Sequence, residues 1–538
     1  MTSQAKTAAA AGAGTVLLAL AAGQFLMALD SSVMNVSIAT VADDLGTTVT
    51  GIQTAIVLYT LVMAMLMVTG GKIGSIIGRK RAFMLGLVVY CSGSLTTALS
   101  PNLGVLIFGW SFLEGVGAAL IMPAIVALVA GNFPPEGRPR AYGLIGAAGA
   151  IAIAVGPLIG GLATTYASWR WVFAGEVVVV AAILLLTKKF EDAPVEQRPH
   201  LDVVGVVLSA TGLALLVFGV LKTGTWGWFR AKEGAPDWGG LSPCIWLMIG
   251  GIFVIWLFFA WEHRREDRGQ EPLVRPQMLR NSQLAGGLVM FCCQFMIQAG
   301  IFFVVPLYLS VCLGLSALET GARLLPLSIT LLVAALGIPR LWPRAAPRLV
   351  VRSGLLALLA GALVLLGGLE ADSGAEVVFV PLLLIGLGIG ALASQLGAVT
   401  VSAVPDDQSP EVGGLQNTMT NLGASIGTAL AGSVMIATLT TAFIANIQSS
   451  PAIPDRVKSQ ATVKLASGVP FISDDDLEAA LDEAHVSSRT TDAALDAYRN
   501  ARIDGLKSAL AILGLITVLA LFGARRIPTV PVGSPGPP

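Results

Sequence analysis

The sequence predicts an all-α polytopic membrane protein with two six-helix bundles and two inserted helices, about fourteen transmembrane helices in total. The chain has 538 residues, of which 55% are hydrophobic and only 12% are charged. Apolar segments recur along it, and most are close to the ~20 residues that a helix needs to cross the ~30 Å hydrocarbon core of a bilayer. The 61 glycines supply small residues that let membrane helices pack closely.

The apolar segments fall into three groups along the chain. The first six predict an N-terminal bundle over residues 1–187, with spans near 15–40, 51–72, 82–99, 104–131, 141–165 and 170–187. Two spans near 203–221 and 242–262 predict a hairpin that, with its linkers, occupies residues 188–270. The last six predict a C-terminal bundle over residues 271–538, with spans near 284–311, 318–339, 350–369, 377–403, 412–444 and 505–524. Secondary transporters are often built from such repeated halves.

The distribution of positive charge predicts the orientation. The first span runs past the length of a signal-peptide core, so we expect it to be retained. Basic residues gather in alternate loops, for example at Lys72, Arg264 and Arg340, although Lys222 and Arg230 lie in a loop on the other side. A composition rich in Ala, Gly and Arg is typical of GC-rich bacterial genomes. We therefore expect a multi-pass protein of the bacterial inner membrane with both termini in the cytoplasm.

Residues 445–504 form the one sizeable region predicted to lie outside the membrane, on the extracytoplasmic side. It is acidic, and Ser473 followed by Asp476 has the spacing of a helix-capping pair. Leu495, Tyr498, Arg502 and Leu506 recur at helical spacing and lead into the last span. The region is either a solvated cap without a direct role or a mouth that collects cations.

Several function classes lack their usual sequence signals. No phosphate-binding loop of the type Gly-x-x-x-x-Gly-Lys-Ser/Thr occurs, so we expect neither ATP hydrolysis nor another enzymatic activity, and no cofactor. The three histidines, His200, His263 and His485, have no ligand spacing with Cys or acids, so we expect no metal site. No basic arm interleaved with aromatic residues occurs, and we expect no nucleic-acid partner.

Acids within predicted spans are the strongest functional signal. Asp30, Glu114 and Glu176 lie within apolar segments, where a charge is costly and usually marks a substrate or proton path. Burial favours the neutral form of a carboxyl group, so such acids are suited to bind and release protons. Each can also have a purely structural role. Glu319 and Arg323, four residues apart, have the spacing of a structural ion pair.

Two further sets of residues are candidates for a functional role. Gly149, Gly156, Pro157, Gly160 and Gly161 lie in the fifth span and predict a helix that bends or packs tightly, as a hinge between two conformations requires. Polar side chains within spans are candidates either for a central cavity or for hydrogen bonds between helices; they are Asn35, Tyr59, Gln294, Gln298, Gln395, Asn417 and Asn421.

The glycine-rich fifth span resembles the antiporter motif of the major facilitator superfamily, and in particular of its fourteen-span drug:proton antiporter family. Three other stretches carry the same resemblance. They are Leu29, Asp30, Ser32, Val33 and Asn35 in the first span; Gly71, Gly78, Arg79, Lys80 and Arg81 after the second; and Ser168, Trp169, Arg170, Trp171 and Phe173 at the sixth. Gly321, Leu325 and Pro326 resemble the corresponding tenth helix. The resemblance implies a proton-coupled exporter with an acid in the first helix.

Departures from the family pattern concern charged positions. Ser75 and Ile76 stand where the loop motif carries an acid and a base. In the fourth span Ser111 and Glu114 stand where the family pattern has Arg and Gln, and Glu176 stands where Asn is common. The N-terminal half has therefore gained two acids and lost a base, which alters the usual coupling scheme.

The residues and the resemblance together predict a secondary active transporter, a proton-coupled antiporter that exports lipophilic or cationic drugs by alternating access. A dedicated exporter of one endogenous lipid or secondary metabolite is the alternative, and a membrane sensor or scaffold without transport is a more remote one. The expected partners are a small lipophilic or cationic substrate, protons and the lipid bilayer, and we expect a monomer.

Overall fold

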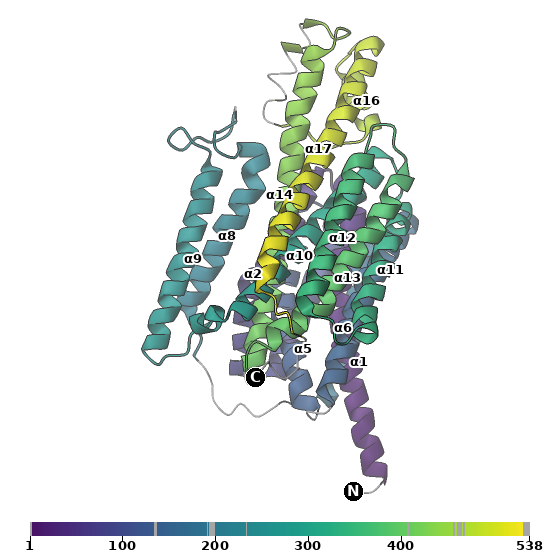
Figure 1. The fold of residues 1–538 in the computed structure, drawn as a ribbon. Helices are drawn as coiled ribbons and strands as arrows, with labels where there is room; N and C mark the ends of the chain where they lie inside the picture. The colour runs from purple at the N-terminus through teal and green to yellow at the C-terminus, as the bar shows by residue number, and fades with distance from the viewer. Residues whose placement is uncertain are drawn as a thin grey trace.

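The computed structural model describes residues 3–133, 137–190, 192, 200–232, 234–405, 408–455, 458–459, 465 and 468–530. The described chain is built from helices that run side by side, and both termini lie at the same end of the molecule (Figure 1). Twelve helices among the described residues are long and apolar enough to cross a membrane.

The N-terminal helices form the predicted first group. They are α1 (Ser3–Asp44), α2 (Val49–Ile77), α3 (Arg79–Ala98), α4 (Leu103–Leu106), α5 (Gly115–Asn132), α6 (Arg138–Tyr166) and α7 (Arg170–Leu186). A π-helical segment, η1 (Ile107–Glu114), joins α4 to α5, so these three pieces make one continuous span. The helices α3 and α7 occupy the third and sixth expected spans but are not among the twelve. They pack on each other inside this group, and α3 also packs on η1 and α5.

The remaining helices follow the other two groups. A hairpin is formed by α8 (Val203–Trp226) and α9 (Pro243–Asp267). The C-terminal group is α10 (Ser282–Leu307) with its π-helical end η4 (Tyr308–Cys312), α11 (Ala317–Leu341), α12 (Pro347–Gly368), α13 (Phe379–Val401), α14 (Ser409–Ser449) and α17 (Ser488–Gly523).

Side-chain caps explain where several helices begin. Thr48 accepts from the N–H of Gly51 at the start of α2, and Asn281 caps α10 in the same way. Ser316 and Glu319 form a capping box at the start of α11. Glu319 and Arg323 do not reach ion-pair distance in this described segment, although the charge of Arg323 acts on Glu319. The Glu319 carboxylate accepts from the backbone N–H and the hydroxyl of Ser316.

The two halves meet mainly through two helix pairs, α2 with α14 and α6 with α11. The closest contacts lie at the end of the bundle away from the termini. There Gln53 of α2 donates its amide to the carbonyl of Thr428 on α14 at 3.0 Å. A Cβ placed on Gly161 of α6 would lie 2.6 Å from the carbonyl oxygen of Ala317 on α11. At this end the halves are in backbone contact.

The hairpin α8–α9 lies along the seam between the halves. Val217 and Leu221 of α8 pack with Leu61 of α2 and Ala429 of α14. Ser433 of α14 donates to the carbonyls of Val220 and Leu221, at 3.1 Å and 3.0 Å. The hairpin therefore contacts both halves at one of their two main junctions.

Two helices are much longer than a bilayer requires. With 41 and 36 residues, α14 and α17 extend about 62 Å and 54 Å at 1.5 Å per residue, against the ~30 Å hydrocarbon core. They project together with α16 (Asp474–Glu483) beyond the other helices, at the end opposite the termini (Figure 1). The sequence predicted that residues 445–504 lie outside the membrane and that a helical face leads into the last span, but it did not predict that α14 and α17 project together. We call this projecting part of α14 and α17, with α16, the stalk.

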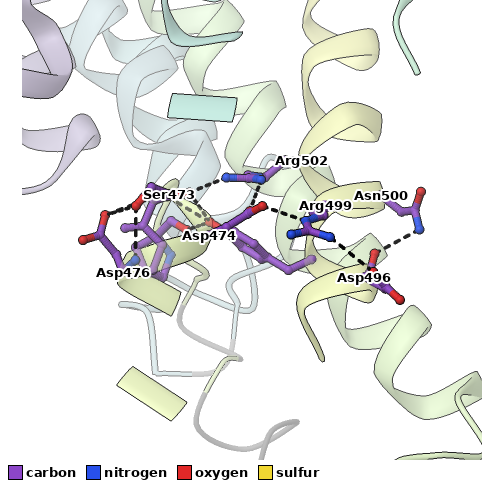
Figure 2. Close-up of polar contacts among 10 residues, drawn as sticks. Ser473, Asp474, Asp476, Asp496, Arg499, Asn500 and Arg502 are labelled. Carbon is purple, nitrogen blue, oxygen red and sulfur yellow. Dashed lines mark hydrogen bonds and ion pairs between the residues drawn. The ribbon is translucent and has the colours of Figure 1, made fainter. Parts of the chain in front are cut away.

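The stalk is held by a compact polar cluster. Figure 2 shows Asp474 between Arg499 and Arg502 of α17. The Nε of Arg499 lies 2.6 Å from Asp474, and Arg502 pairs with the same carboxylate and also donates to the carbonyl of Ile472 at 2.8 Å. The predicted capping pair of Ser473 and Asp476 is confirmed as a capping box. The predicted helical face is also confirmed: Leu495, Tyr498, Arg502 and Leu506 are all buried on α17.

Candidate functional site

Three acids from separate helices meet in the interior of the N-terminal half. Asp30 comes from α1, Glu114 from the end of η1 and Glu176 from α7, and one carboxylate oxygen of each lies within 4.8 Å of the others. Their side chains are 0%, 0% and 2% exposed. The sequence predicted each acid separately; the structure brings all three into one acid cluster.

The hydrogen-bond donors to this cluster come mostly from α3. The hydroxyls of Tyr90 and Ser94 donate to Glu176 Oε2 at 3.2 Å and 3.1 Å, and Thr97 donates to Glu114 Oε1 at 3.2 Å. These residues are spaced by four and then three positions, so they share one face of the helix. Sequence reasoning missed them, although hydroxyls at this spacing were the signal that could have identified the face.

Asp30 is bound by an indole. The Nε1–H of Trp110 reaches both carboxylate oxygens of Asp30, at 2.9 Å and 3.0 Å. Trp110 lies on the π-helical segment η1, four residues before Glu114. A π-helical turn adds a residue per turn, and such turns are frequent at functional sites. In this segment Trp110, Ser111 and Glu114 are all buried.

The cluster lacks a compensating positive charge. Among the described residues no Lys or Arg forms an ion pair with any of the three acids. Two oxygens, Glu114 Oε2 and Glu176 Oε1, are buried without a hydrogen-bond partner in the described chain. Carboxylates that share a site cannot all be charged in a medium of low dielectric constant. Such a cluster is chemically suited to hold protons.

A metal ion is a poorer fit to this arrangement. Ca²⁺ takes six to eight oxygen ligands and Mg²⁺ keeps several waters, whereas three carboxylates in a fully buried site offer few positions. The expectation of no metal site therefore stays a prediction.

A cavity of about 350 Å³ lies next to the cluster, between the two halves. Its walls come from α1, α2, η1, α5 and α6 on one side and from α10 and α14 on the other. Five of the seven predicted cavity residues line it; these are Asn35, Tyr59, Gln298, Asn417 and Asn421. Gln294 is buried elsewhere on α10, and Gln395 donates to Ser394 on α13, so neither lines this cavity.

An aromatic layer separates the cavity from the acids. Trp110 and Tyr59 both line the cavity and stack on each other, with ring centroids 5.0 Å apart and an interplanar angle of 10°. Asp30, Glu114 and Glu176 are absent from the cavity wall in the described structure. The Nε1–H of the same Trp110 indole donates to Asp30. Trp110 thus contacts both the cavity and the acid cluster.

The predicted loop motif lies at the end of the molecule that carries the termini. Gly78 separates α2 from α3 with a φ of 101°, a backbone conformation that favours glycine. Arg79, Lys80 and Arg81 open α3, and the Lys80 ammonium donates to the carbonyl of Phe190 at 2.9 Å. Gly71 lies on α2 against Pro123 of α5.

A second cavity, of about 280 Å³, lies beside this motif. Its lining includes Gly71, Lys72 and Arg79, together with Glu271 and Glu411 from the other side of the seam. Lys72 forms an ion pair with Glu271 at 2.9 Å. The two halves are therefore bridged by charges at this end and by backbone contacts at the other.

The glycines of α6 make close helix contacts. A Cβ on Gly156 or Gly160 would collide with Ser32 or Val33 of α1, respectively, and a Cβ on Gly149 would lie 3.1 Å from the amide nitrogen of Gln24. Gly161 faces α11, and Gly321 of α11 approaches the carbonyl of Pro157. The helix continues through Pro157 without ending. In this conformation the glycines of α6 let the helix pack against α1 on one face and against α11 on another.

Comparison with known proteins identifies the family. The model of the Major Facilitator Superfamily matches residues 20–231 and 203–428. The chain is 31% identical over 426 residues to the tetracenomycin C resistance and export protein of Streptomyces glaucescens, covering 78% of this chain and 75% of that protein. It is 30% identical to the probable actinorhodin transporter of Streptomyces coelicolor, covering 88% of this chain and 80% of the relative.

Solved structures show the same fold at low sequence identity. A bacterial homologue of the human lysosomal transporter Spinster, in an inward-facing and unoccupied conformation, aligns with a TM-score of 0.59 at 13% identity, covering 96% of this chain and 98% of that one. The peptide transporter POT in complex with sulfate aligns with a TM-score of 0.56 at 15% identity, covering 96% of each chain. The expectation drawn from the motifs is confirmed: the chain is a membrane transporter that belongs to the Major Facilitator Superfamily.

Proposed function

We propose that this transporter is a proton-coupled antiporter that exports lipophilic or cationic compounds by alternating access. The observation that carries the proposal is the acid cluster of Asp30, Glu114 and Glu176, which lacks a basic partner in the described chain and lies one side chain away from a cavity shared by both halves. The names of the relatives add support, because they include antibiotic resistance and export proteins of Streptomyces.

The driving force is sufficient for such export. One charge that moves through ~100 mV supplies ~2.3 kcal/mol, and one pH unit adds ~1.4 kcal/mol. Together these support a gradient of roughly 500-fold for a neutral substrate exchanged against one proton. In this scheme the acids exchange protons while the cavity alternates between the two sides of the membrane.

The orientation and helix count belong to the same proposal. We assign the end with the termini, Lys72 and Arg79 to the cytoplasm of a bacterial cell, because positive charge gathers there. On this assignment the stalk is extracytoplasmic and the described conformation is closed towards the outside. We also infer that α3 and α7 cross the membrane, which brings the total to fourteen in two bundles with an inserted hairpin at residues 188–270.

A dedicated exporter of one endogenous compound is the second candidate. The observation that favours it is that several relatives are named for single compounds, such as tetracenomycin C and actinorhodin. A panel of unrelated substrates separates the two, because a broad exporter responds to several of them and a dedicated exporter to none or one.

The test is proton movement in acid-loaded, inside-out vesicles. A panel of lipophilic cations and neutral drugs is added to vesicles that contain the wild type or Asp30→Asn at equal expression. We expect compounds to trigger proton release in the wild type and not in the variant. Release that survives in Asp30→Asn moves the coupling to Glu114 or Glu176, and no release with any compound contradicts the broad antiporter.

A further inference from the structure

We propose that Trp110 couples occupancy of the cavity to protonation of Asp30, as a positioning residue that touches both. The inference rests on the proposed function and adds the physical link between its two sites. It starts from the position of the indole, whose N–H holds both oxygens of Asp30 while its ring forms part of the cavity wall.

The geometry leaves no direct contact between a compound in the cavity and the acids. Asp30 is fully buried and does not line the cavity in the described structure. Trp110 and Tyr59, stacked at 5.0 Å, stand between them. In the described structure a compound in the cavity therefore touches Asp30 only through the aromatic layer, in which the Trp110 indole makes the hydrogen bonds to Asp30.

Tyr59 is the other polar group of the aromatic layer beside Asp30, and its hydroxyl also interacts with the carboxylate. Glu114 of η1 and Glu176 of α7 are acids and repel an ionised Asp30, while the hydroxyl of Tyr90 on α3 donates to Glu176. Ser111 stands at the position where the family pattern has Arg, and its hydroxyl donates to the carbonyl of Ala55 at 2.8 Å. Among the described residues no Lys or Arg pairs with Asp30, and the indole N–H is the hydrogen-bond donor beside it.

The sign of the coupling follows from the strength of this hydrogen bond. An ionised carboxylate accepts a bond roughly twice as strong as a neutral group does, so a charged Asp30 fixes the indole flat against Tyr59 and leaves the cavity open. A protonated Asp30 holds the indole weakly, which lets the ring turn into the cavity and occupy the space of the substrate. Proton and substrate therefore exclude each other, as antiport requires, and the effect is reciprocal by linkage.

Trp110→Phe is the decisive variant, because it keeps an aromatic face next to Tyr59 and removes the N–H donor. The probe is tetraphenylphosphonium with the purified full-length protein in liposomes. For the wild type we expect the affinity for the probe to fall about tenfold between pH 8 and pH 6, and a pH gradient to drive its accumulation. For Trp110→Phe we expect an affinity that is independent of pH, and downhill flux without accumulation.

Trp169→Phe is the matched control. Trp169 is also a buried indole whose N–H holds a carboxylate, that of Asp44 at 2.8 Å, but it does not line the cavity. It should keep the pH dependence and the accumulation of the wild type.

Three outcomes overturn the inference. A wild-type pH profile with coupled accumulation in Trp110→Phe shows that the N–H does not transmit the signal. Loss of probe binding at every pH in Trp110→Phe, with a folded protein by size exclusion, reduces Trp110 to part of the binding surface. Absence of pH-driven transport in the wild type contradicts the proposed function and this inference together. This outcome differs from the other two because it is seen in the wild type alone, before any variant is compared.

Discussion

Glu114 and Glu176 each keep one buried carboxylate oxygen without a donor among the described residues, although their other oxygens accept hydroxyl bonds. An unsatisfied buried oxygen costs about 1–3 kcal/mol, and more when the group is charged. Such a destabilising group is kept in a protein when it has a function. A proton on either oxygen supplies the missing donor, so stability and proton binding are linked at the same atoms.

Glu176→Gln tests this link. The Gln amide supplies an N–H donor where Glu176 would need a bound proton, and it removes a negative charge from the cluster. We therefore expect the free energy of unfolding in detergent to rise by about 1 kcal/mol. The number of protons exchanged per substrate should fall, because the cluster loses one titrating group. Glu176→Leu is the contrasting variant: it leaves the hydroxyls of Tyr90 and Ser94 without their acceptor, and we expect destabilisation of about 1–3 kcal/mol. Equal stability of the two variants contradicts the argument.

At the scale of helices, hydrophobicity predicted the positions of the spans because burial in lipid requires long apolar runs. It did not predict which polar residues meet. The acids lie on α1, η1 and α7, and only the packing of α3 among them brings Tyr90, Ser94 and Thr97 to the cluster. The π-helical turn of η1, which sets the direction of Trp110, has no sequence signal of its own. The lining amides were predicted in part, since α13 carries Gln395 away from the cavity.

The contact of α6 with α11 gives the next prediction. A Cβ on Gly161 meets the carbonyl oxygen of Ala317 at 2.6 Å, and backbone atoms cannot move aside as side chains do. Gly161→Val should therefore prevent the halves from closing at this end and reduce transport at least tenfold with the protein still folded. Gly143→Ala on the same helix is the control, because no atom lies within 4 Å of its added carbon. Transport by Gly161→Val at the wild-type rate would show that this closure is dispensable.

The linker between the hairpin and α10 gives a prediction at the opposite end. Glu262 of α9 accepts a hydrogen bond from the N–H of Leu273 at 2.7 Å and so fixes the linker. In this position Glu271 forms an ion pair with Lys72 at 2.9 Å. The N–H of Arg275 donates to Glu411 at 3.0 Å. Lys72→Glu should open this end and slow transport several-fold, with less than about 1 kcal/mol lost in stability since the pair is partly exposed. The double variant with Glu271→Lys should recover most of the rate. If the double variant transports no faster than Lys72→Glu, Lys72 has a role other than pairing with Glu271.

For the whole molecule, the arrangement of contacts defines one state of a two-state cycle. Backbone contacts close the end away from the termini, while the end with the termini is bridged by the ion pair of Lys72 with Glu271, beside the cavity of about 280 Å³. Exposed ion pairs are weak, and backbone packing is strong. The hairpin α8–α9 lies on α2 and α14, across one of the two junctions, so it must follow or permit their relative motion.

A reversible lock across that junction tests the cycle. Gln53 of α2 lies against Gly432 of α14 and donates to the carbonyl of Thr428, so cysteines at Gln53 and Gly432 should form a disulfide on mild oxidation. The locked protein can bind substrate from the side of the termini but cannot release it at the other end, and we expect export to stop and to return on reduction. The native cysteines Cys91, Cys244, Cys292, Cys293 and Cys312 are free, so each single-cysteine variant serves as a control for oxidation alone. Continued export by the cross-linked double variant would mean that α2 and α14 do not separate at this end during transport, and the opening would then have to lie at the contact of α6 with α11.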